Sequence, residues 1–260
     1  MSPAVPTVGL FLFRSFPFTI PHVRRCNNPS QMAVVWRRSS VASRMGACQN
    51  EENMNKGVLV AIEGIDGAGK TTQARRITER MRSDGFDVVL TKEPTDGQWG
   101  TKIRLSAYSG RHDPWEELVL FMNDREEHVA QVIGPSLEAG KVVVVDRYYY
   151  SSVAYQGARG LPPDDILEQN EQIAPRPDLV ALLNVAPTVG VSRVCKRDGQ
   201  GNFFEREDYL GEVAQLFRTY CTGNHVLRID GVMSAETITA EILRRLYEGP
   251  LYGRVPRHPD

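Results

Sequence analysis

The sequence predicts an α/β fold in which a mostly parallel central sheet is flanked by helices on both faces. Short apolar runs alternate along the chain with segments of helical length and periodicity. The runs are continuously apolar, as is typical of strands buried on both faces of a parallel sheet. Strands that alternate with helices favour right-handed crossovers. With 260 residues and 41% hydrophobic residues, the chain is long enough for one domain with a substantial core.

The first strand begins at Val58 and ends where a glycine-rich turn starts. Later strands are predicted at Phe86–Thr91, Lys141–Val145, Asp178–Val185 and His225–Ile229. The turn-rich segment Lys92–Gly100 follows the strand Phe86–Thr91, at the kind of strand end where open α/β sheets bind ligands. Helices are predicted at Thr72–Arg82, Thr101–Tyr108, Pro114–Leu137, Thr188–Arg197, Asp208–Cys221 and Ala235–Tyr247.

Residues 1–54 differ in composition from the rest of the chain. Their first fifty residues hold six arginines and no acidic residue, are rich in Ser and Pro, and lack periodicity. They are either an organelle transit peptide or sequence upstream of a true start at Met54. In both cases we expect residues 1–54 to be disordered, residues 55–250 to form the domain, and residues 251–260 to form a flexible tail. A start at Met54 implies a cytoplasmic protein, whereas a transit peptide implies a mitochondrion or plastid.

Composition argues against several classes of protein. The formal net charge is −1, and because the first fifty residues are basic, the body is acidic and has no evident face for nucleic acid. No run of about 18 apolar residues is present, so no membrane span is expected. The four cysteines show no metal-ligand spacing, which favours a reducing compartment.

Within the segment Val58–Thr72, the residues Gly64–Thr71 fit the phosphate-binding pattern G-x-x-x-x-G-K-[ST] between a predicted strand and a predicted helix. Glycines let the backbone turn tightly, so that consecutive N–H groups converge on one anion. The helix N-terminus and Lys70 add positive charge, and the Thr71 hydroxyl is suited to Mg²⁺. The alternative is a glycine-rich turn that binds nothing. The predicted ATP-binding residues here are Gly64, Ile65, Asp66, Gly67, Ala68, Gly69, Lys70, Thr71 and Thr72.

Arg125 lies on the apolar stripe of the long predicted helix, four residues after Phe121. A buried cation is costly unless it meets an anion. Arg125 therefore pairs either with a carboxylate of the fold or with a phosphate of a ligand, and the helix alone leaves both open.

Asp146 and Arg147 end a buried strand. In phosphate-loop proteins an aspartate at this place usually serves Mg²⁺ or its water shell, and a guanidinium beside it suits a phosphate. The alternative is that the two residues pair with each other or with neighbours. Of the aromatic residues that follow, Tyr155 is the best candidate for a ligand contact.

Arg193, Lys196 and Arg197 place positive charges near the end of one helix, immediately before the break 198–202, which contains two glycines. Cations beside a glycine hinge suggest a lid that closes over the transferred phosphoryl group. The alternative is a solvated helix end whose cations complement the dipole.

These residues together resemble the thymidylate kinase family of phosphate-loop kinases, over roughly Lys56–Glu248. The motifs that carry the resemblance are Gly64-Ile65-Asp66, Lys92-Glu93-Pro94, Ile103-Arg104, Leu120-Phe121, Asp124-Arg125, Asp146-Arg147-Tyr148, Ser151-Ser152 and Ala154-Tyr155-Gln156-Gly157. The resemblance implies a kinase fold with a small lid, transfer of the γ-phosphoryl group of ATP to dTMP with Mg²⁺, and a homodimer.

The resemblance also implies roles for residues around the nucleoside of dTMP. Phe121 would stack on thymine, with Ser151 and Ser152 lining the base pocket. Asp66 would accept a hydrogen bond from the sugar 3′-hydroxyl. Tyr155 would crowd the 2′ position and favour deoxyribose.

For the phosphate of dTMP, the resemblance implies Arg104 and Arg147, while Arg125 would reach the base or the monophosphate region. The implied dTMP-binding set is Asp66, Glu93, Pro94, Arg104, Phe121, Arg125, Arg147, Ser151, Ser152, Tyr155 and Gln156.

The sequence departs from part of the family at Gly67, where some members carry a basic residue in the phosphate loop. The missing cation would come from the lid, as in the bacterial type. Lys70, Arg147 and Arg197 are then the expected catalytic residues, Arg193 and Lys196 further ATP contacts, and Thr71 and Asp146 the residues for the metal. The rivals are a kinase of another nucleotide on the same scaffold and a GTP-dependent switch, although the D-G-x-P-R and N-K-x-D signatures are both missing.

Overall fold

A computed structural model describes residues 56–109, 112–198 and 203–254. The predicted leader, residues 1–54, and the hinge residues 199–202 lie outside the described residues. At the other end, Leu251 is buried in the core, and residues 255–260 of the predicted tail are likewise outside.

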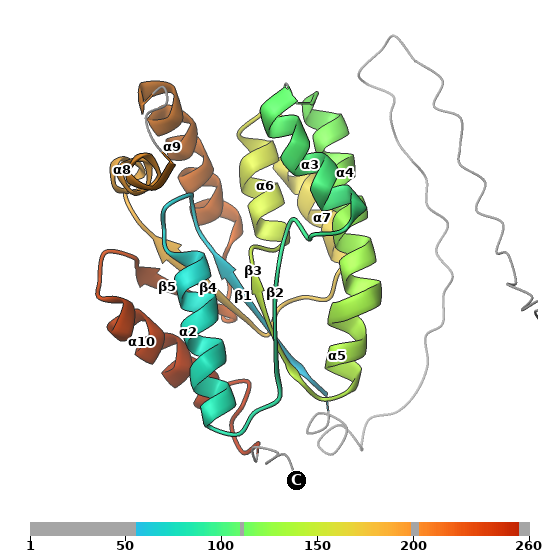
Figure 1. The fold of residues 1–260 in the computed structure, drawn as a ribbon, viewed down its shortest axis with the longest axis vertical. Helices are drawn as coiled ribbons and strands as arrows, with labels where there is room; N and C mark the ends of the chain where they lie inside the picture. Colours follow the sequence, from blue (N-terminus) through green and yellow to red (C-terminus); the bar gives the residue numbers. More distant parts are fainter. Residues whose placement is uncertain (1–55, 110–111, 199–202, 255–260) are drawn as a thin grey trace, which may run out of the picture. The chain divides into compact units, whose positions relative to one another are not determined.

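Five parallel strands form one sheet in the order β2-β3-β1-β4-β5 (Figure 1). The central strand β1 pairs with β3 on one side, Val60 opposite Val144, and with β4 on the other, Val60 opposite Leu179. The strand bounds are β1 Val58–Glu63, β2 Val88–Lys92, β3 Val142–Asp146, β4 Leu179–Asn184 and β5 Val226–Asp230. The prediction of a parallel sheet is confirmed.

Helices cover both faces of the sheet. The chain moves from β1 to β2 in one direction across the sheet and then returns through β3, β4 and β5, so right-handed crossovers place α2 on one face and the later connections on the other. Helix α10 packs on α2, and α6 contacts α4, α7 and α9. The helices are α2 Lys70–Ser83, α3 Gln98–Ser109, α4 Pro114–His128, α5 Gly134–Glu138, α6 Tyr149–Gly157, α7 Pro163–Ile173, α8 Pro187–Asp198, α9 Phe203–Tyr220 and α10 Ala235–Tyr247.

Burial explains the apolar runs. Strands β1, β3 and β4 lie inside the sheet, and nearly all of their residues are buried. The edge strands β2 and β5 contain partly exposed positions and accordingly carry polar residues, such as Lys92 and Arg228. Strands β1, β3 and β4 form the centre of the main hydrophobic core.

The prediction of one long helix at Pro114–Leu137 is wrong in detail. Helix α4 ends at His128, a π-helical turn covers Val129–Ile133, and α5 follows. Pro135 has no N–H to donate to the preceding turn, so the regular α-helical ladder cannot continue through it. Helices α6 and α7 were not predicted: the tyrosine-rich start of α6 lacks a helical apolar pattern, whereas Pro163 at the first position of α7 is a recognisable helix start.

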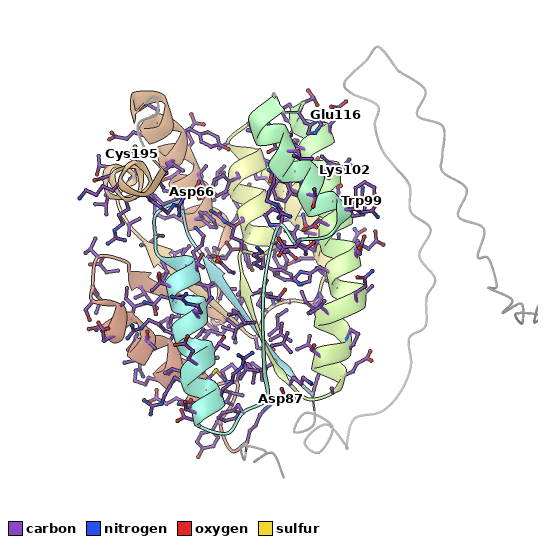
Figure 2. The ribbon with its side chains drawn as sticks, viewed as in Figure 1. Asp66, Asp87, Trp99, Lys102, Glu116 and Cys195 are labelled. Carbon is purple, nitrogen blue, oxygen red and sulfur yellow. The ribbon has the colours of Figure 1, made fainter. Side chains whose placement is uncertain are left out.

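All parallel strands point their carboxyl ends at one edge of the sheet. Figure 2 shows Asp66, in the loop after β1, at this edge, and Asp87, which precedes β2, at the opposite end. The loop after β1, the end of β2 and the end of β3 therefore meet at the carboxyl edge, which is where open α/β sheets bind ligands.

Candidate functional site

The loop between β1 and α2 has the backbone of a phosphate cradle. Gly64, Gly67 and Gly69 have φ angles of 142°, 78° and 100°, which L-residues with side chains rarely adopt. A Cβ at Gly67 would lie 2.3 Å from the carbonyl oxygen of Gly190 on α8. A basic side chain at this position therefore cannot fit without moving α8, which gives the departure at Gly67 a steric reason.

Lys70 is the first residue of α2 and lies inside the loop. Its Nζ donates hydrogen bonds to the carbonyl oxygens of Gly64, at 2.9 Å, and Ile65, at 2.8 Å. Burial, reinforced by the Arg147 guanidinium, lowers the pKa of Lys70 below its ordinary value. Lys70 lines a cavity of about 470 Å³, the phosphate pocket. This pocket is lined by Asp66, Gly67, Gly69, Lys70, Thr71, Thr72, Lys92, Glu93, Pro94, Arg104, Asp146, Arg147, Arg193, Val194 and Arg197.

Thr71 and Asp146 meet on one wall of the phosphate pocket. The Thr71 hydroxyl donates to Oδ2 of Asp146 at 2.5 Å, while Oδ1 of Asp146 is buried and has no hydrogen-bond partner. A hydroxyl beside a carboxylate oxygen without a partner fits Mg²⁺, which prefers oxygen ligands and keeps several waters or phosphate oxygens. The described residues contain no cluster of three or more His, Cys, Asp or Glu side chains for a metal held by protein alone.

Arg147 has an unusual backbone conformation at the boundary of two cavities. Its φ of 70° makes it the one non-glycine residue with positive φ among those described. Its guanidinium pairs with the carboxylate of Asp66, contacts Oγ of Ser151 at 3.5 Å and lies 5.1 Å from the centre of the Tyr155 ring. Burial alone would raise the pKa of Asp66, but Arg147 and Lys70 outweigh burial and the net pKa is lowered.

Glu63, the last residue of β1, holds the turn that carries Arg147. Its carboxylate accepts hydrogen bonds from the backbone N–H groups of Tyr148 and Ser151, at 2.9 and 3.1 Å, and from the Ser151 hydroxyl at 2.6 Å. Burial raises the pKa of Glu63 to about 7, although these hydrogen bonds act against the rise. One carboxylate thus connects the strand before the phosphate loop to the start of α6.

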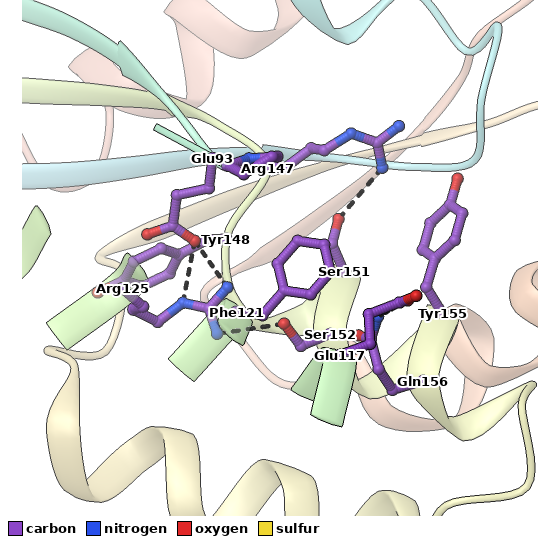
Figure 3. Close-up of a pocket in the computed structure, with 11 residues that line it drawn as sticks. Glu93, Glu117, Phe121, Arg125, Arg147, Tyr148, Ser151, Ser152, Tyr155 and Gln156 are labelled. Atoms are coloured by element: carbon purple, nitrogen blue, oxygen red, sulfur yellow. Dashed lines mark hydrogen bonds and ion pairs between the residues drawn. The ribbon is translucent and has the colours of Figure 1, made fainter. Parts of the chain in front are cut away.

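A second cavity of about 170 Å³, the base pocket, adjoins the first (Figure 3). Phe121 and Tyr148 give it aromatic walls, and polar side chains converge on it from α4 and α6. Glu93, Pro94 and Arg147 line both pockets, so the two cavities are neighbours. The base pocket is lined by Glu93, Pro94, Glu117, Phe121, Arg125, Arg147, Tyr148, Ser151, Ser152, Tyr155 and Gln156.

Arg125 pairs with a carboxylate of the fold, which was one of the two alternatives. Its Nε and Nη2 donate to Oε2 of Glu93 at 2.9 and 2.6 Å, and Nη1 donates to Ser152 at 3.2 Å and to Asn170. The other oxygen of Glu93 lies 3.0 Å from Nδ1 of His128. Arg125 is 1% exposed, yet it also lines the base pocket, so this pairing does not remove it from contact with a ligand.

Gln156 and Glu117 form the polar end of the base pocket. Nε2 of Gln156 donates to Glu117 at 3.0 Å, and Oε1 of Gln156 is buried with no hydrogen-bond partner. The pocket therefore offers a ligand an acceptor on Gln156 and, on Arg125, the one N–H group that these contacts leave over.

The predicted lid cations occupy three different environments. Arg193 donates to the carbonyl oxygens of Gly67, at 3.1 Å, and Gly231, at 3.2 Å, and so connects the phosphate loop to the loop after β5. Arg197 lines the phosphate pocket. Lys196 is exposed and lines neither pocket. Of the three, Arg193 and Arg197 are therefore the two that the fold brings to the site.

Arg104 reaches the phosphate pocket from α3. It donates to the carbonyl oxygens of Pro94, at 3.2 Å, and Thr95, at 2.7 Å, and lies 3.3 Å from Asp96. These contacts hold the guanidinium beside the loop after β2, facing the cavity that Arg147 also lines.

Several residues of the site were missed by sequence reasoning. Glu63, Lys92 and Tyr148 end or follow strands at the carboxyl edge, and Lys92 and Tyr148 belong to motifs of the resemblance, but none of the three was given a role. Glu117 carries no such local signal, because only the packing of α4 against α6 brings it to the pocket.

Comparison with known proteins agrees with this geometry. A family model described as Thymidylate kinase matches residues 62–242. A thymidylate kinase of Xanthomonas oryzae pv. oryzae (strain PXO99A) is 48% identical over 183 residues, 70% of this chain and 79% of that protein. A thymidylate kinase of Xylella fastidiosa (strain M23) is 45% identical over 192 residues, 74% of this chain and 88% of that protein.

Within the part of the chain that the structure describes, no helix has the length and apolar character that a membrane crossing requires.

Proposed function

The chain belongs to the thymidylate kinase family and is an enzyme that phosphorylates dTMP to dTDP with ATP, and we propose that its two adjoining pockets carry out this reaction. ATP places its phosphates on the loop Gly64–Thr72, and dTMP occupies the base pocket. The observation that supports this arrangement most is the position of Arg147, which lines both cavities. The transferred phosphoryl group then passes beside Arg147.

The base pocket suits a thymine ring. Phe121 offers an aromatic face for stacking. The remaining N–H group of Arg125 matches the O4 carbonyl of thymine, and the oxygen of Gln156 that has no partner matches the N3–H group. Ser151 and Ser152 complete the wall at the base.

The sugar and the phosphate of dTMP extend from the base pocket toward the phosphate loop. Tyr155 packs near the Arg147 guanidinium and limits the space at the 2′ position. The carboxylate of Asp66 accepts a hydrogen bond from the 3′-hydroxyl once its ion pair with Arg147 loosens. Arg104 and Arg147 bind the monophosphate. Glu93 and Pro94 contact dTMP from the wall that the two pockets share.

The reaction needs positioning and neutralisation of charge more than covalent chemistry from the protein. An oxygen of the dTMP phosphate attacks the γ-phosphorus in line. The new O–P bond forms while the bond to the β–γ bridging oxygen breaks, and ADP leaves with that electron pair. Lys70, Arg147 and Arg197 offset the negative charge on the equatorial and bridging oxygens. Mg²⁺, held by Thr71 and by Asp146 directly or through water, would supply further neutralisation of the polyphosphate.

The remaining assignments rest on the resemblance and on composition. Arg193 supports ATP through the phosphate loop that it holds, and Lys196 contacts ATP only if the end of α8 moves.

We further propose a homodimer, a catalytic domain of residues 55–250 and a cytoplasmic location, with a mitochondrion or plastid as the alternative if residues 1–54 are a transit peptide. Light scattering of the purified protein tests the dimer.

A substrate panel tests the function. ADP release is measured with ATP and each of dTMP, dUMP, UMP, CMP, AMP and thymidine. We expect dTMP to give the highest kcat/KM, with dUMP second, and Lys70→Met to lower kcat for dTMP by about 10²- to 10³-fold with little change in melting temperature. A preference for a ribonucleotide or for thymidine would overturn the assignment of substrate. A variant at Lys70 with near-normal turnover would overturn the role of the loop.

A further inference from the structure

We infer that Glu117 is a positioning residue for base specificity: it fixes the side-chain amide of Gln156 so that the amide oxygen, and not the nitrogen, faces the base. This inference rests on the proposed function, because it concerns the base pocket of dTMP. It assigns a role to a residue that neither touches a phosphate nor lies in any of the motifs that suggested the family.

Glu117 is held firmly in place. It lies in the first turn of α4 and is 4% exposed. One carboxylate oxygen accepts from Nη1 of Arg159 at 2.6 Å, and the other accepts from Nε2 of Gln156 at 3.0 Å. Arg159 is itself held by the carbonyl oxygen of His112 at 2.8 Å.

The charge of Glu117 determines the orientation of the amide. A guanidinium at 2.6 Å favours the ionised carboxylate, and an ionised carboxylate can only accept hydrogen bonds. The group of Gln156 that faces Glu117 must therefore be its NH₂. A flipped amide would bring two acceptor oxygens together in a buried place, where such a contact is costly.

The opposite side of the amide is left for the ligand. Gln156 is 1% exposed, and its Oε1 is buried with no hydrogen-bond partner. Both Gln156 and Glu117 line the base pocket, where Figure 3 shows them next to Ser152 and Tyr155. A buried acceptor without a partner is satisfied by a donor, and the ring edge of thymine or uracil carries one at N3.

Cytosine has the opposite pattern at the same ring position. Its N3 is an acceptor, so it would face the fixed oxygen of Gln156 without a hydrogen bond. Pockets with fixed polar groups reject ligands that leave those groups unpaired much more strongly than apolar pockets reject a change of size. Glu117 thus contributes to the discrimination between bases through the Gln156 amide that it orients.

The test compares dTMP with 5-methyl-dCMP, which keeps the methyl group, the sugar and the phosphate and changes only the polar edge of the base. In Glu117→Gln the new amide can both donate and accept, so Gln156 is free to turn. We expect the ratio of kcat/KM for dTMP to that for 5-methyl-dCMP to fall about tenfold or more relative to the unsubstituted enzyme. The fall should come from a higher KM for dTMP and a lower KM for 5-methyl-dCMP, with the KM for ATP unchanged.

Glu116→Gln is the matched control, because Glu116 is the neighbouring residue of the same turn and its side chain is 71% exposed. This variant should keep the original ratio. If Glu117 only supports the fold, Glu117→Gln lowers the melting temperature or kcat with both substrates, and the ratio stays constant; that result would overturn the inference.

Should Glu117→Gln fold poorly, Arg159→Met provides the second variant. It leaves both side chains of the Glu117–Gln156 contact in place and removes a guanidinium that holds the Glu117 carboxylate. The ratio should then fall, by less than in Glu117→Gln, and a ratio equal to that of the unsubstituted enzyme would contradict the inference. An unsubstituted enzyme that does not prefer dTMP to 5-methyl-dCMP would count against the proposed function itself.

Discussion

The phosphate pocket and the base pocket are built in different ways. The first contains a cradle of backbone from one continuous loop, whose glycines have positive φ angles and whose lysine follows directly, and arginines from other elements complete its wall. The second is made of side chains from separate elements, held by buried pairs such as Arg125 with Glu93 and Arg159 with Glu117. Substitutions in the loop of the phosphate pocket should therefore lower activity with little loss of stability. Substitutions in the base pocket should lower both activity and stability.

Arg125→Met should give the largest effect on stability. The substitution leaves Glu93 buried with only His128 beside its carboxylate, and breaking one side of a buried ion pair typically costs about 3 to 5 kcal/mol. Urea unfolding should show this loss, together with a KM for dTMP raised tenfold or more. Lys70→Met, by contrast, should change rate without a comparable loss of stability.

The double variant Arg125→Met, Glu93→Gln is the control for this comparison. Neutralising Glu93 removes the charge that was left without its partner, so part of the stability should return while the KM for dTMP stays high. A loss below about 1 kcal/mol for Arg125→Met alone would mean that the pair does not support the fold, and the contrast between the pockets would fail.

Glu63 holds the turn that carries Arg147, a residue of both pockets, and the effect of substituting Glu63 should be smaller and dependent on pH. Its pKa is about 7 in the folded protein and near 4.5 when it is exposed in the unfolded chain, so between these values the folded state binds the proton more tightly. Its contribution to the free energy of unfolding is full below about pH 4.5 and is lost as the pH rises through 7. The full difference is on the order of 3 kcal/mol.

Glu63→Gln removes this titration. The variant should therefore gain stability relative to the unsubstituted protein as the pH is raised from 5 to 8, as measured by urea unfolding at each pH. Glu116→Gln serves again as the exposed control. A difference that is constant from pH 5 to 8 would show that Glu63 has the same pKa in the folded and unfolded states.

The sequence predicts the loop of the phosphate pocket well because the parts of that loop are neighbours in the chain. The pattern from Gly64 to Thr71 specifies a turn, a cation and a helix start in sequence, and the parallel sheet then fixes which edge Asp146 and Lys92 reach. Even there, only the fold separates Arg197, which lines the pocket, from Lys196, which does not.

The base pocket could be predicted only in part. The stripe on the long helix identifies Arg125 as a buried cation, but its partner Glu93 lies 32 residues earlier in the chain and Asn170 lies 45 residues later. No local pattern selects these partners, because their pairing depends on how α4 packs against α7 and against the residue that follows β2. Glu117 was missed for the same reason: in the sequence it is one of two adjacent glutamates, and burial alone distinguishes it from Glu116.

The most direct test of the account uses one molecule that spans both pockets, an adenosine and a thymidine joined through their 5′ positions by a chain of phosphates. Calorimetric titration should give one molecule bound per chain, with prior saturation by either ATP or dTMP alone weakening its binding. Arg147→Met should lower its affinity more than it lowers that of ATP or dTMP alone, because Arg147 lines both pockets. If the joined molecule competes with only one of the two nucleotides, the pockets do not form a single site and the account is contradicted.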